Sequence, residues 1–242
     1  IEDAGLNASA PPQQRLLDGW LLRLSPGKAK RARCVNALYE GRLPLAERIA
    51  QSQAAFADAG LPFIVRITPF SAPAHLDAHL ADLGLRRFDD TRVMVCPSIP
   101  TDTPPALDLQ PVNATLYAEA VGSLRGSPPA QRVAQAERLA TSPVPYRGFV
   151  LHEGKTVVAC GQYAREGSLV GLYDVYTAPS HRGRGLARSL CRHLLQRACT
   201  EGARTAYLQV EADNAPARAV YHGLGFADGY AYHYRTSDPT AA

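Results

Sequence analysis

The sequence lacks an apolar run long enough to cross a membrane, because no stretch reaches the roughly 18 residues that a span needs. It also begins without the positively charged and then apolar segments of a secretory leader, so no leader is expected. Cysteine is scarce, odd in number and without CxxC or His/Cys ligand spacing. These features predict a cytoplasmic protein with no membrane association, no disulfide framework and no metal site. The five cysteines are Cys34, Cys96, Cys160, Cys191 and Cys199.

Neither positive nor negative charge dominates the sequence. The 26 basic residues are interspersed with 22 acidic ones, for a net charge of +4 over 242 residues. No basic stripe with interleaved aromatic residues is present in the sequence, so nucleic-acid binding is not expected. The small positive net charge is compatible with an anionic small-molecule ligand. The 46% of hydrophobic residues can supply the core of one large domain or of two small ones.

A proline-rich stretch divides the chain. Residues 96–111, CPSIPTDTPPALDLQP, hold five prolines and no regular pattern until their end, which is typical of a linker. We therefore predict a domain over residues 1–100 and another over residues 101–242.

The second domain alternates helical and strand patterns. Apolar residues at helical spacing predict two helices, and period-two patterns then predict three strands. A long helix from Leu186 to about residue 200 has one wide apolar face that must pack on a sheet. This order predicts an α/β (α+β) fold with a mixed central sheet flanked by helices. The expected helices cover 113–124, 129–140, 186–200 and a short stretch after 214, and the expected strands cover 148–164 (two strands and a turn), 168–177, 205–211 and 227–235.

The first hundred residues repeat part of this order. Strand patterns at 19–25 and 33–39 precede a helix at 44–60, a strand at 62–69, a short helix and a strand within 82–95. Arg182 and Gly225 are 43 residues apart, and the corresponding Pro44 and Gly84 are 40 apart. We interpret this as a divergent internal duplication, although two unrelated α/β pieces of similar period would give the same pattern.

The segment HRGRGLARSL (181–190) places Gly183 and Gly185 where a helix begins. Glycine inside a helix costs roughly 1 kcal/mol relative to alanine, so these residues need another reason. A strand, a glycine turn and a helix N-terminus together form an anion site, because the first-turn N–H groups lack partners and a phosphate can approach closely. The alternative without a ligand is a turn that only connects a strand to a helix.

Two motifs resemble the GNAT superfamily of acyl-CoA-dependent N-acyltransferases. RGRGLA (182–187) is similar to the family signature (Q/R)xxGx(G/A), and NAPARAVYHGLGF (214–226) is similar to the second signature, which ends in YxxxGF. The resemblance covers about residues 106–235 in the order of the elements. It implies the acyl-CoA N-acyltransferase fold, here duplicated, and acetyl-CoA as the co-substrate with no metal.

The resemblance also assigns cofactor contacts. The pyrophosphate is expected on the backbone of the glycine loop, and the pantetheine arm is expected beside the splayed strand. Arg182, Arg184 and Arg188 are candidates for phosphate contacts, and an asparagine is a further contact on the cofactor side. A solvated basic surface is the alternative for the arginines, including Arg188, and a plain helix N-cap is the alternative for the asparagine. The cofactor-binding residues are Val175, Tyr176, Thr177, Arg182, Gly183, Arg184, Gly185, Leu186, Ala187 and Asn214.

Catalytic roles follow from the same resemblance and from the chemistry of amide formation. Tyr221 stands at the family position that assists thiolate departure, with a core tyrosine as the alternative. Asp174 is a charged residue within an apolar strand and is our candidate for the general base. Glu211 is the competing candidate, and a structural ion pair is the non-catalytic alternative for Asp174.

We therefore expect an N-acetyltransferase that transfers acetyl from acetyl-CoA to a primary amine of a small molecule or peptide by direct attack. The alternative is a non-catalytic acyl-CoA-binding regulatory module. The first half lacks the two-glycine signature and is expected to be a degenerate GNAT-like domain without a cofactor. Only one strand follows Gly225, where the family usually has two, so the other half is a candidate to complete the sheet. A monomer or a homodimer is expected.

Overall fold

The computed structural model describes residues 1–27, 29–100, 102 and 107–238. Of the proline-rich stretch 96–111, residues 101 and 103–106 lie outside this description. The chain forms two compact units. Unit 1 contains Ile1–Ala8 and Val93–Gly229, and unit 2 contains Ser9–Arg92 and Tyr230–Ala242. Two long strands, β5 (Arg86–Cys96) and β11 (Ala227–Thr236), run from one unit into the other.

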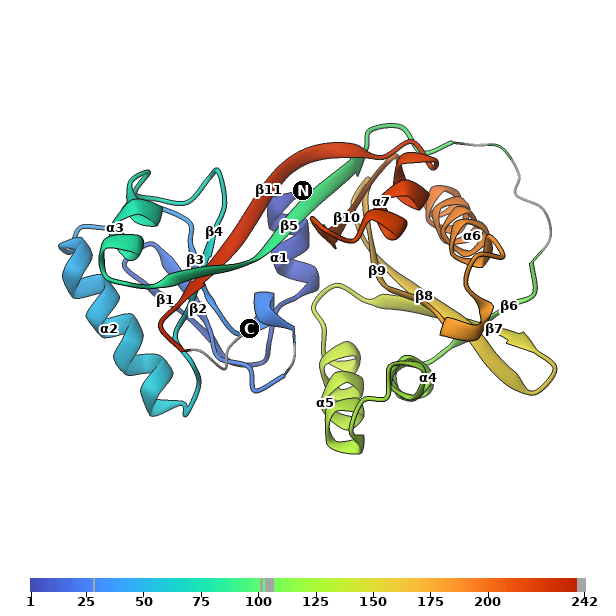
Figure 1. Cartoon of the computed structure of the whole chain (residues 1–242), viewed down its shortest axis with the longest axis horizontal. Coiled ribbons are helices and arrows are strands. Elements are labelled where there is room, and N and C mark those ends of the chain that lie inside the picture. Colours follow the sequence, from blue (N-terminus) through green and yellow to red (C-terminus); the bar gives the residue numbers. More distant parts are fainter. Residues whose placement is uncertain (28, 101, 103–106, 239–242) are drawn as a thin grey trace. The chain divides into compact units, whose positions relative to one another are not determined.

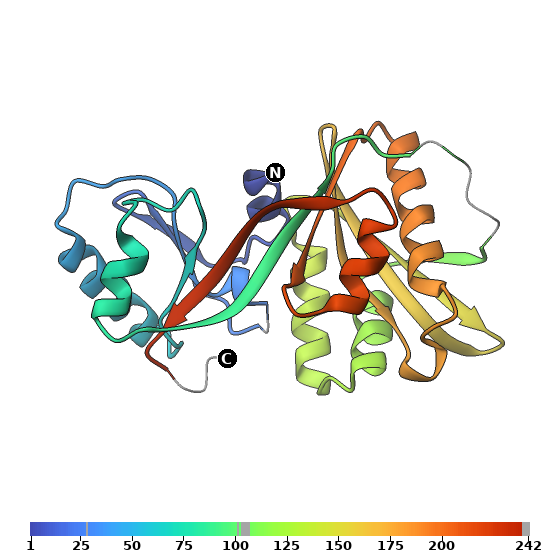
Figure 2. The same cartoon turned by 45° about the horizontal axis from the view of Figure 1, so that its top comes forward.

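Unit 1 is built on a mixed sheet. Strands β6 to β9 lie in sequence order as antiparallel neighbours, β10 lies parallel to β9, and the end of β5 follows β10. Helices α4 (Ala114–Arg125) and α5 (Pro129–Ala140) cover one face, and α6 (Leu186–Thr200) and α7 (Ala215–His222) cover the other (Figures 1 and 2). The remaining elements of this unit are α1 (Glu2–Ala8), β6 (Leu109–Val112), β7 (Tyr146–Glu153), β8 (Thr156–Glu166), β9 (Leu169–Thr177), the short helix η2 (Pro179–His181) and β10 (Thr205–Glu211).

Helix α6 holds the core of unit 1 together. It begins at Leu186 and ends at Thr200, as its apolar spacing predicts. Leu190, Leu194 and Ala198 are fully buried and pack against side chains of β8, β9 and β10. Burying a leucine side chain contributes roughly 1.5–3 kcal/mol, so this face fixes the helix on the sheet and thereby places the glycine loop before it.

Unit 2 repeats the central crossover of unit 1. Strand β3 (Val35–Ala37) is parallel to β4 (Ile64–Ile67), with α2 (Leu45–Asp58) between them in the chain, just as α6 lies between the parallel strands β9 and β10. Side chains of α2 and α3 (Leu76–Asp82) pack with β2 to β4 into one core. The remaining elements are β1 (Gln14–Leu17), β2 (Trp20–Arg23) and the short helix η1 (Lys30–Ala32).

Each half of the chain supplies the final strand of the other half's sheet. Strand β11 follows α7, yet its end pairs with β4 in unit 2, where His233 is opposite Ile67. Strand β5 follows α3, yet its end lies next to β10, and its buried Met94 and Cys96 belong to the core of unit 1. This accounts for the single strand after Gly225. The descent of the two halves from one duplicated domain, divided near residue 100, stays a prediction.

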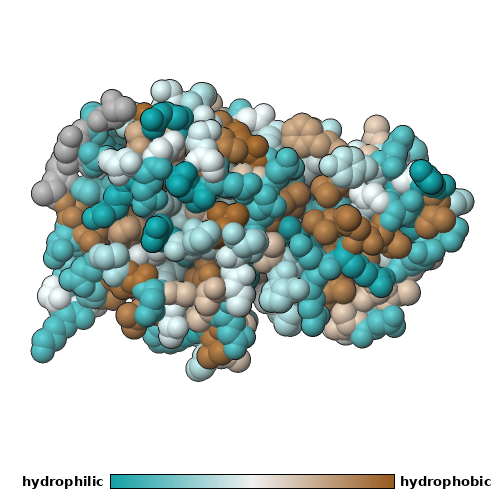
Figure 3. Space-filling model, turned by 180° about the vertical axis from the view of Figure 1, so that it is seen from behind, coloured by the Kyte–Doolittle hydropathy of each residue, from teal (hydrophilic) through white to brown (hydrophobic). Residues whose placement is uncertain are grey.

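Most of the expected elements are present within one to three residues of their expected ends. Helix α1 and strand β1 were not expected, because they are short and have no regular apolar spacing. No helix among the described residues is long and apolar enough to span a membrane. On the face drawn in Figure 3, hydrophobic residues lie in patches that hydrophilic residues interrupt.

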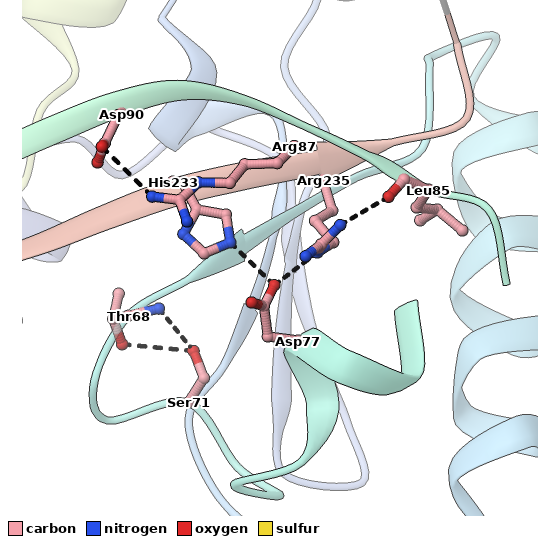
Figure 4. A network of polar contacts seen from close by, with 8 residues as sticks. All are labelled: Thr68, Ser71, Asp77, Leu85, Arg87, Asp90, His233 and Arg235. Atoms are coloured by element: carbon pink, nitrogen blue, oxygen red, sulfur yellow. Dashed lines mark hydrogen bonds and ion pairs between the residues drawn. The ribbon is translucent and has the colours of Figure 1, made fainter. Parts of the chain in front are cut away.

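A polar network joins β11 to α3 inside unit 2 (Figure 4). His233 Nε2 and Arg235 Nε lie 2.9 and 2.5 Å from Asp77 Oδ1, and Arg235 Nη1 donates to the carbonyl oxygen of Leu85 at 2.8 Å. The hydrogen bond from Arg235 lowers the pKa of Asp77, and burial lowers the pKa of His233. Folding therefore favours a deprotonated Asp77 and a neutral His233, relative to the unfolded chain.

Acid should destabilise unit 2 through this network. The unfolded chain binds a proton at His233 more readily than the folded chain does, so the free energy of unfolding should fall as pH drops through about 6.5. It should fall again towards pH 3.8, where Asp77 is protonated in the unfolded state. His233→Gln should flatten the first of these slopes in chemical denaturation between pH 7 and 5. His75→Gln, at an exposed histidine of the same unit, should leave it unchanged, and an unaltered slope in His233→Gln would contradict the assignment.

Candidate active site

Strands β9 and β10 part at the centre of unit 1. Their parallel pairing runs from Leu169 and Thr205 to Leu172 and Leu208, although β9 continues to Thr177 and β10 continues to Glu211. Beyond Leu172, the edge of β9 that faces away from β8 is therefore not paired with β10. An extended ligand can add to such an edge through backbone hydrogen bonds.

A bulge in β9 lies directly after the last residue that pairs with β10. Between the pairs Gln162–Tyr173 and Cys160–Tyr176 the register with β8 shifts, so β9 contains one extra residue there. Asp174 occupies the bulge with φ +48°, a left-handed conformation that is uncommon for a residue other than glycine. Its carbonyl oxygen accepts a hydrogen bond from the buried Tyr117 hydroxyl at 3.0 Å.

The carboxylate of Asp174 is held by three side chains from three different elements. Arg125 Nη1 donates to Oδ1 at 3.0 Å, and the amide nitrogens of Gln135 and Gln162 donate to Oδ2 at 3.1 and 2.9 Å. Sequence reasoning singled out Asp174 but none of these partners. The signal available for Gln162 was its position as an amide in an otherwise apolar strand, and it is 1% exposed. Asp174 thus forms an ion pair while keeping about a quarter of its side chain exposed, at 23%.

The glycine loop lies between η2 and α6. Gly183 has φ +76° and Gly185, the N-cap of α6, has φ +75°. An added Cβ at either glycine would meet nothing within 4 Å. The backbone conformation therefore requires these glycines, packing does not, and the space beside the loop is open. The first-turn N–H groups of α6, including those of Leu186 and Ala187, have no acceptor within the helix.

Two residues of this segment, Arg182 and Arg184, are arginines with contacts to neighbouring strands. Arg182 donates to the hydroxyl of Tyr176 and the carbonyl oxygen of Thr177, both at 3.3 Å, and its guanidinium lies 5.5 Å from the Tyr176 ring centroid. Arg184 forms two hydrogen bonds with Glu153, at 2.5 and 3.2 Å. The structure thus brings the predicted strand residues 175–177 together with the predicted loop residues.

The second motif forms α7. Asn214 Oδ1 accepts a hydrogen bond from the backbone N–H of Ala217 at 3.2 Å, so its side chain is the N-cap of this helix. Tyr221 packs against the core of unit 1, with its ring 6.1 Å from that of Phe226. Burial raises the pKa of the Tyr221 phenol, so it stays protonated at neutral pH. None of the described residues forms a hydrogen bond with its hydroxyl.

The corresponding loop of unit 2 holds a carboxylate of its own chain. The backbone N–H groups of Arg42 and Leu43, just before α2, donate to the two oxygens of Asp18 at 2.9 Å each. These hydrogen bonds lower the pKa of Asp18. An added Cβ at Gly41 would lie 1.9 Å from Asp18 Oδ2, so glycine is required here to let the carboxylate approach. In unit 2 the amides before the crossover helix therefore already bind an anion.

Comparisons with known proteins find a family match over most of unit 1. Residues 114–226 match the Acetyltransferase (GNAT) family. Over 228 residues the chain is 25% identical to YobR of Bacillus subtilis, an uncharacterized N-acetyltransferase, covering 92% of this chain and 91% of that one. Over 55 residues it is 42% identical to the [ribosomal protein bS18]-alanine N-acetyltransferase of Salmonella typhimurium, covering 23% and 37%.

A solved structure resembles the whole chain. It is a GCN5-related N-acetyltransferase from Kribbella flavida, which superposes with a TM-score of 0.70 at 17% identity and covers 98% of this chain and 93% of that one. At this level of identity the likeness concerns the fold. The expectation of an acyl-CoA N-acyltransferase fold is confirmed.

Gly185→Val should weaken CoA binding by roughly tenfold or more, because a β-branched residue disfavours the left-handed conformation and its side chain would fill the open space. Gly202→Val is the matched control, since Gly202 also has a positive φ and open surroundings but follows the other end of α6. Calorimetry should show CoA binding lost in the first variant and kept in the second. Equal affinities in two folded variants would contradict the loop assignment.

Proposed function

We propose that this chain, of which residues 114–226 match the Acetyltransferase (GNAT) family, transfers the acetyl group of acetyl-CoA to a primary amine of a small molecule or peptide. The observation that carries this proposal is the meeting of the glycine loop with the parted edge of β9. One offers N–H groups and open space for a pyrophosphate, and the other offers an unpaired strand edge for an extended amide-containing arm.

Acetyl-CoA would bind with its pyrophosphate on the backbone of Gly183 to Ala187. Its pantetheine arm would lie along Val175, Tyr176 and Thr177. Arg182, which already reaches the end of β9, and Arg184 supply positive charge beside the loop. Asn214 supports this arrangement by starting α7, which carries Tyr221.

The proposed reaction is direct attack. The amine nitrogen bonds to the thioester carbonyl carbon, the carbon–sulfur bond breaks, and the nitrogen loses a proton to a base. The departing sulfur gains negative charge, and the protonated hydroxyl of Tyr221 can donate to it. This interaction would be stronger in the transition state than in the ground state, which is the condition for accelerating the reaction.

Asp174 is the proposed proton acceptor, either directly or through water. Its place on the bulge of β9, next to the parted edge, and its partial exposure support this role. To accept a proton it would have to weaken its contact with Arg125. Glu211, the exposed last residue of β10, is the competing carboxylate.

The first half of the chain is proposed to bind no cofactor. Asp18 supports this, because its carboxylate occupies the N–H groups that precede α2. The proteins similar to this chain have names that state different acceptors. A screen of amines that follows thiol release from acetyl-CoA would identify the acceptor.

Tyr221→Phe should lower kcat on the order of 10²-fold while leaving CoA affinity nearly unchanged, because the ring and its packing remain. The measurement is steady-state kinetics with the amine from the screen, alongside CoA titration and melting curves. Tyr232→Phe, a buried tyrosine of unit 2, is a control for removal of a hydroxyl. A kcat within about twofold of wild type in Tyr221→Phe would remove the phenol from the mechanism.

Asp174→Asn and Glu211→Gln separate the two candidate bases. Loss of the base should lower kcat on the order of 10²-fold and remove the acidic limb of the pH–rate profile. We expect both effects in Asp174→Asn and neither in Glu211→Gln. A residue that only positions the bulge would lower kcat and keep the acidic limb, and this result for Asp174→Asn would exclude it as the base.

A further inference from the structure

The ion pair between Arg125 and Asp174 lies within unit 1, beside the parted edge of β9, and it is partly exposed. Arg125 is the last residue of α4, Asp174 is on the bulge, and their side chains are 35% and 23% exposed. The pair presents a positive and a negative charge side by side, with Arg125 Nη1 and Asp174 Oδ1 3.0 Å apart. A ligand at this place therefore meets two opposite charges at once.

This ion pair opposes the proton transfer that the proposed function assigns to Asp174. An arginine guanidinium keeps its charge in proteins, so protonation of Asp174 would take away the negative charge that faces Arg125. Gln135 and Gln162 donate to the other oxygen, Oδ2, and are uncharged, so they do not compensate. An acceptor that brings a negative charge of its own to Arg125 removes this obstacle.

A second contact holds Arg125 independently of Asp174. Its guanidinium lies 5.4 Å from the centroid of the Tyr176 ring, which is on the same strand as Asp174. This is a cation–π contact, and it does not involve the carboxylate. Arg125 therefore keeps a contact with β9 when it exchanges one carboxylate for another, and its planar set of N–H groups suits a carboxylate.

A free α-amino acid carries the two charges that match this pair. Its ammonium and carboxylate groups are bonded to the same carbon atom, so they also stand side by side. With the carboxylate on Arg125, the ammonium group lies next to Asp174, and each charge of the acceptor faces the opposite charge of the protein. A peptide N-terminus or a simple amine lacks the adjacent carboxylate and would leave Arg125 on Asp174.

We propose that the acceptor is a free α-amino acid, whose carboxylate takes the place of Asp174 on Arg125 while Asp174 accepts a proton from the amine. This inference rests on the proposed function and narrows its acceptor class. The ammonium group gives up two protons as the nitrogen–carbon bond forms and the carbon–sulfur bond breaks. One proton ends on the sulfur of CoA, and Asp174 takes the other. The product is an N-acetyl amino acid, whose carboxylate still lies on Arg125.

Pairs of acceptors that differ only in this charge test the proposal. Each proteinogenic amino acid is compared with its α-carboxamide, in which a neutral amide replaces the carboxylate, by following thiol release from acetyl-CoA. The best amino acid should have a kcat/KM roughly tenfold or more above that of its carboxamide, as expected for one charge-assisted contact. Arg125→Gln should bring this ratio close to one, and Arg125→Lys, which keeps the charge, should retain part of it.

Arg165→Gln is the matched control and should keep the wild-type ratio, because Arg165 is also a partly exposed arginine near a carboxylate, with Nε 3.9 Å from Glu201 Oε2. An Arg125 that only held Asp174 would affect both members of a pair alike. Equal rates with both members, a ratio that Arg125→Gln leaves unchanged, or turnover only with amines outside the panel would overturn this inference alone. No thiol release with any amine would contradict the proposed function as well.

Discussion

The parting of β9 from β10 is the constraint on which the rest of the site depends. Two parallel strands that stayed paired to their ends would leave no edge for an extended ligand. The bulge at Asp174 lies where the pairing has ended, and it requires a left-handed conformation that persists only where its surroundings fix it. Here Arg125, Gln135 and Gln162 hold the side chain, and Tyr117 holds the carbonyl oxygen.

Asp174 thus lies on the bulge of β9 and is also the proposed base. Its carboxylate pairs with Arg125 and accepts hydrogen bonds from the amides of Gln135 and Gln162, and its side chain stays partly exposed. Tyr221 differs from Asp174, because burial raises the pKa of its phenol and keeps it protonated at neutral pH. In the proposed reaction, Asp174 would accept the proton of the amine and Tyr221 would donate one to the departing sulfur.

The two crossovers of the chain show how similar topology can lead to different chemistry. In unit 1 the loop before α6 has glycines with positive φ and open space beside it. In unit 2 the loop before α2 folds onto Asp18, which takes the N–H groups of Arg42 and Leu43. The register of β3 with β4 covers only two pairs, and neither strand continues past the other as β9 does. The first loop is open to an external anion and the second holds an internal one.

Much of the fold could be predicted because local signals agree with it. The apolar stripe of α6, the glycines at 183 and 185 and the cap at Asn214 each act within a few residues. The single strand after Gly225 made the other half a candidate to complete the sheet, but the sequence could not say that β5 and β11 are the strands exchanged. Alternation of apolar residues identifies a strand and does not reveal its neighbour. The partners of Asp174 were missed for the same reason, since Arg125, Gln135 and Gln162 come from α4, α5 and β8 and meet it only in the folded chain.

Hydrogen exchange with and without CoA tests the central claim most directly, because it reports on backbone amides at both loops in one experiment. The account predicts that CoA slows exchange at residues 183–187 and 175–177, and that it leaves residues 41–47 before and within α2 unchanged. Protection at 41–47, or none at 183–187 when CoA is bound, would contradict it.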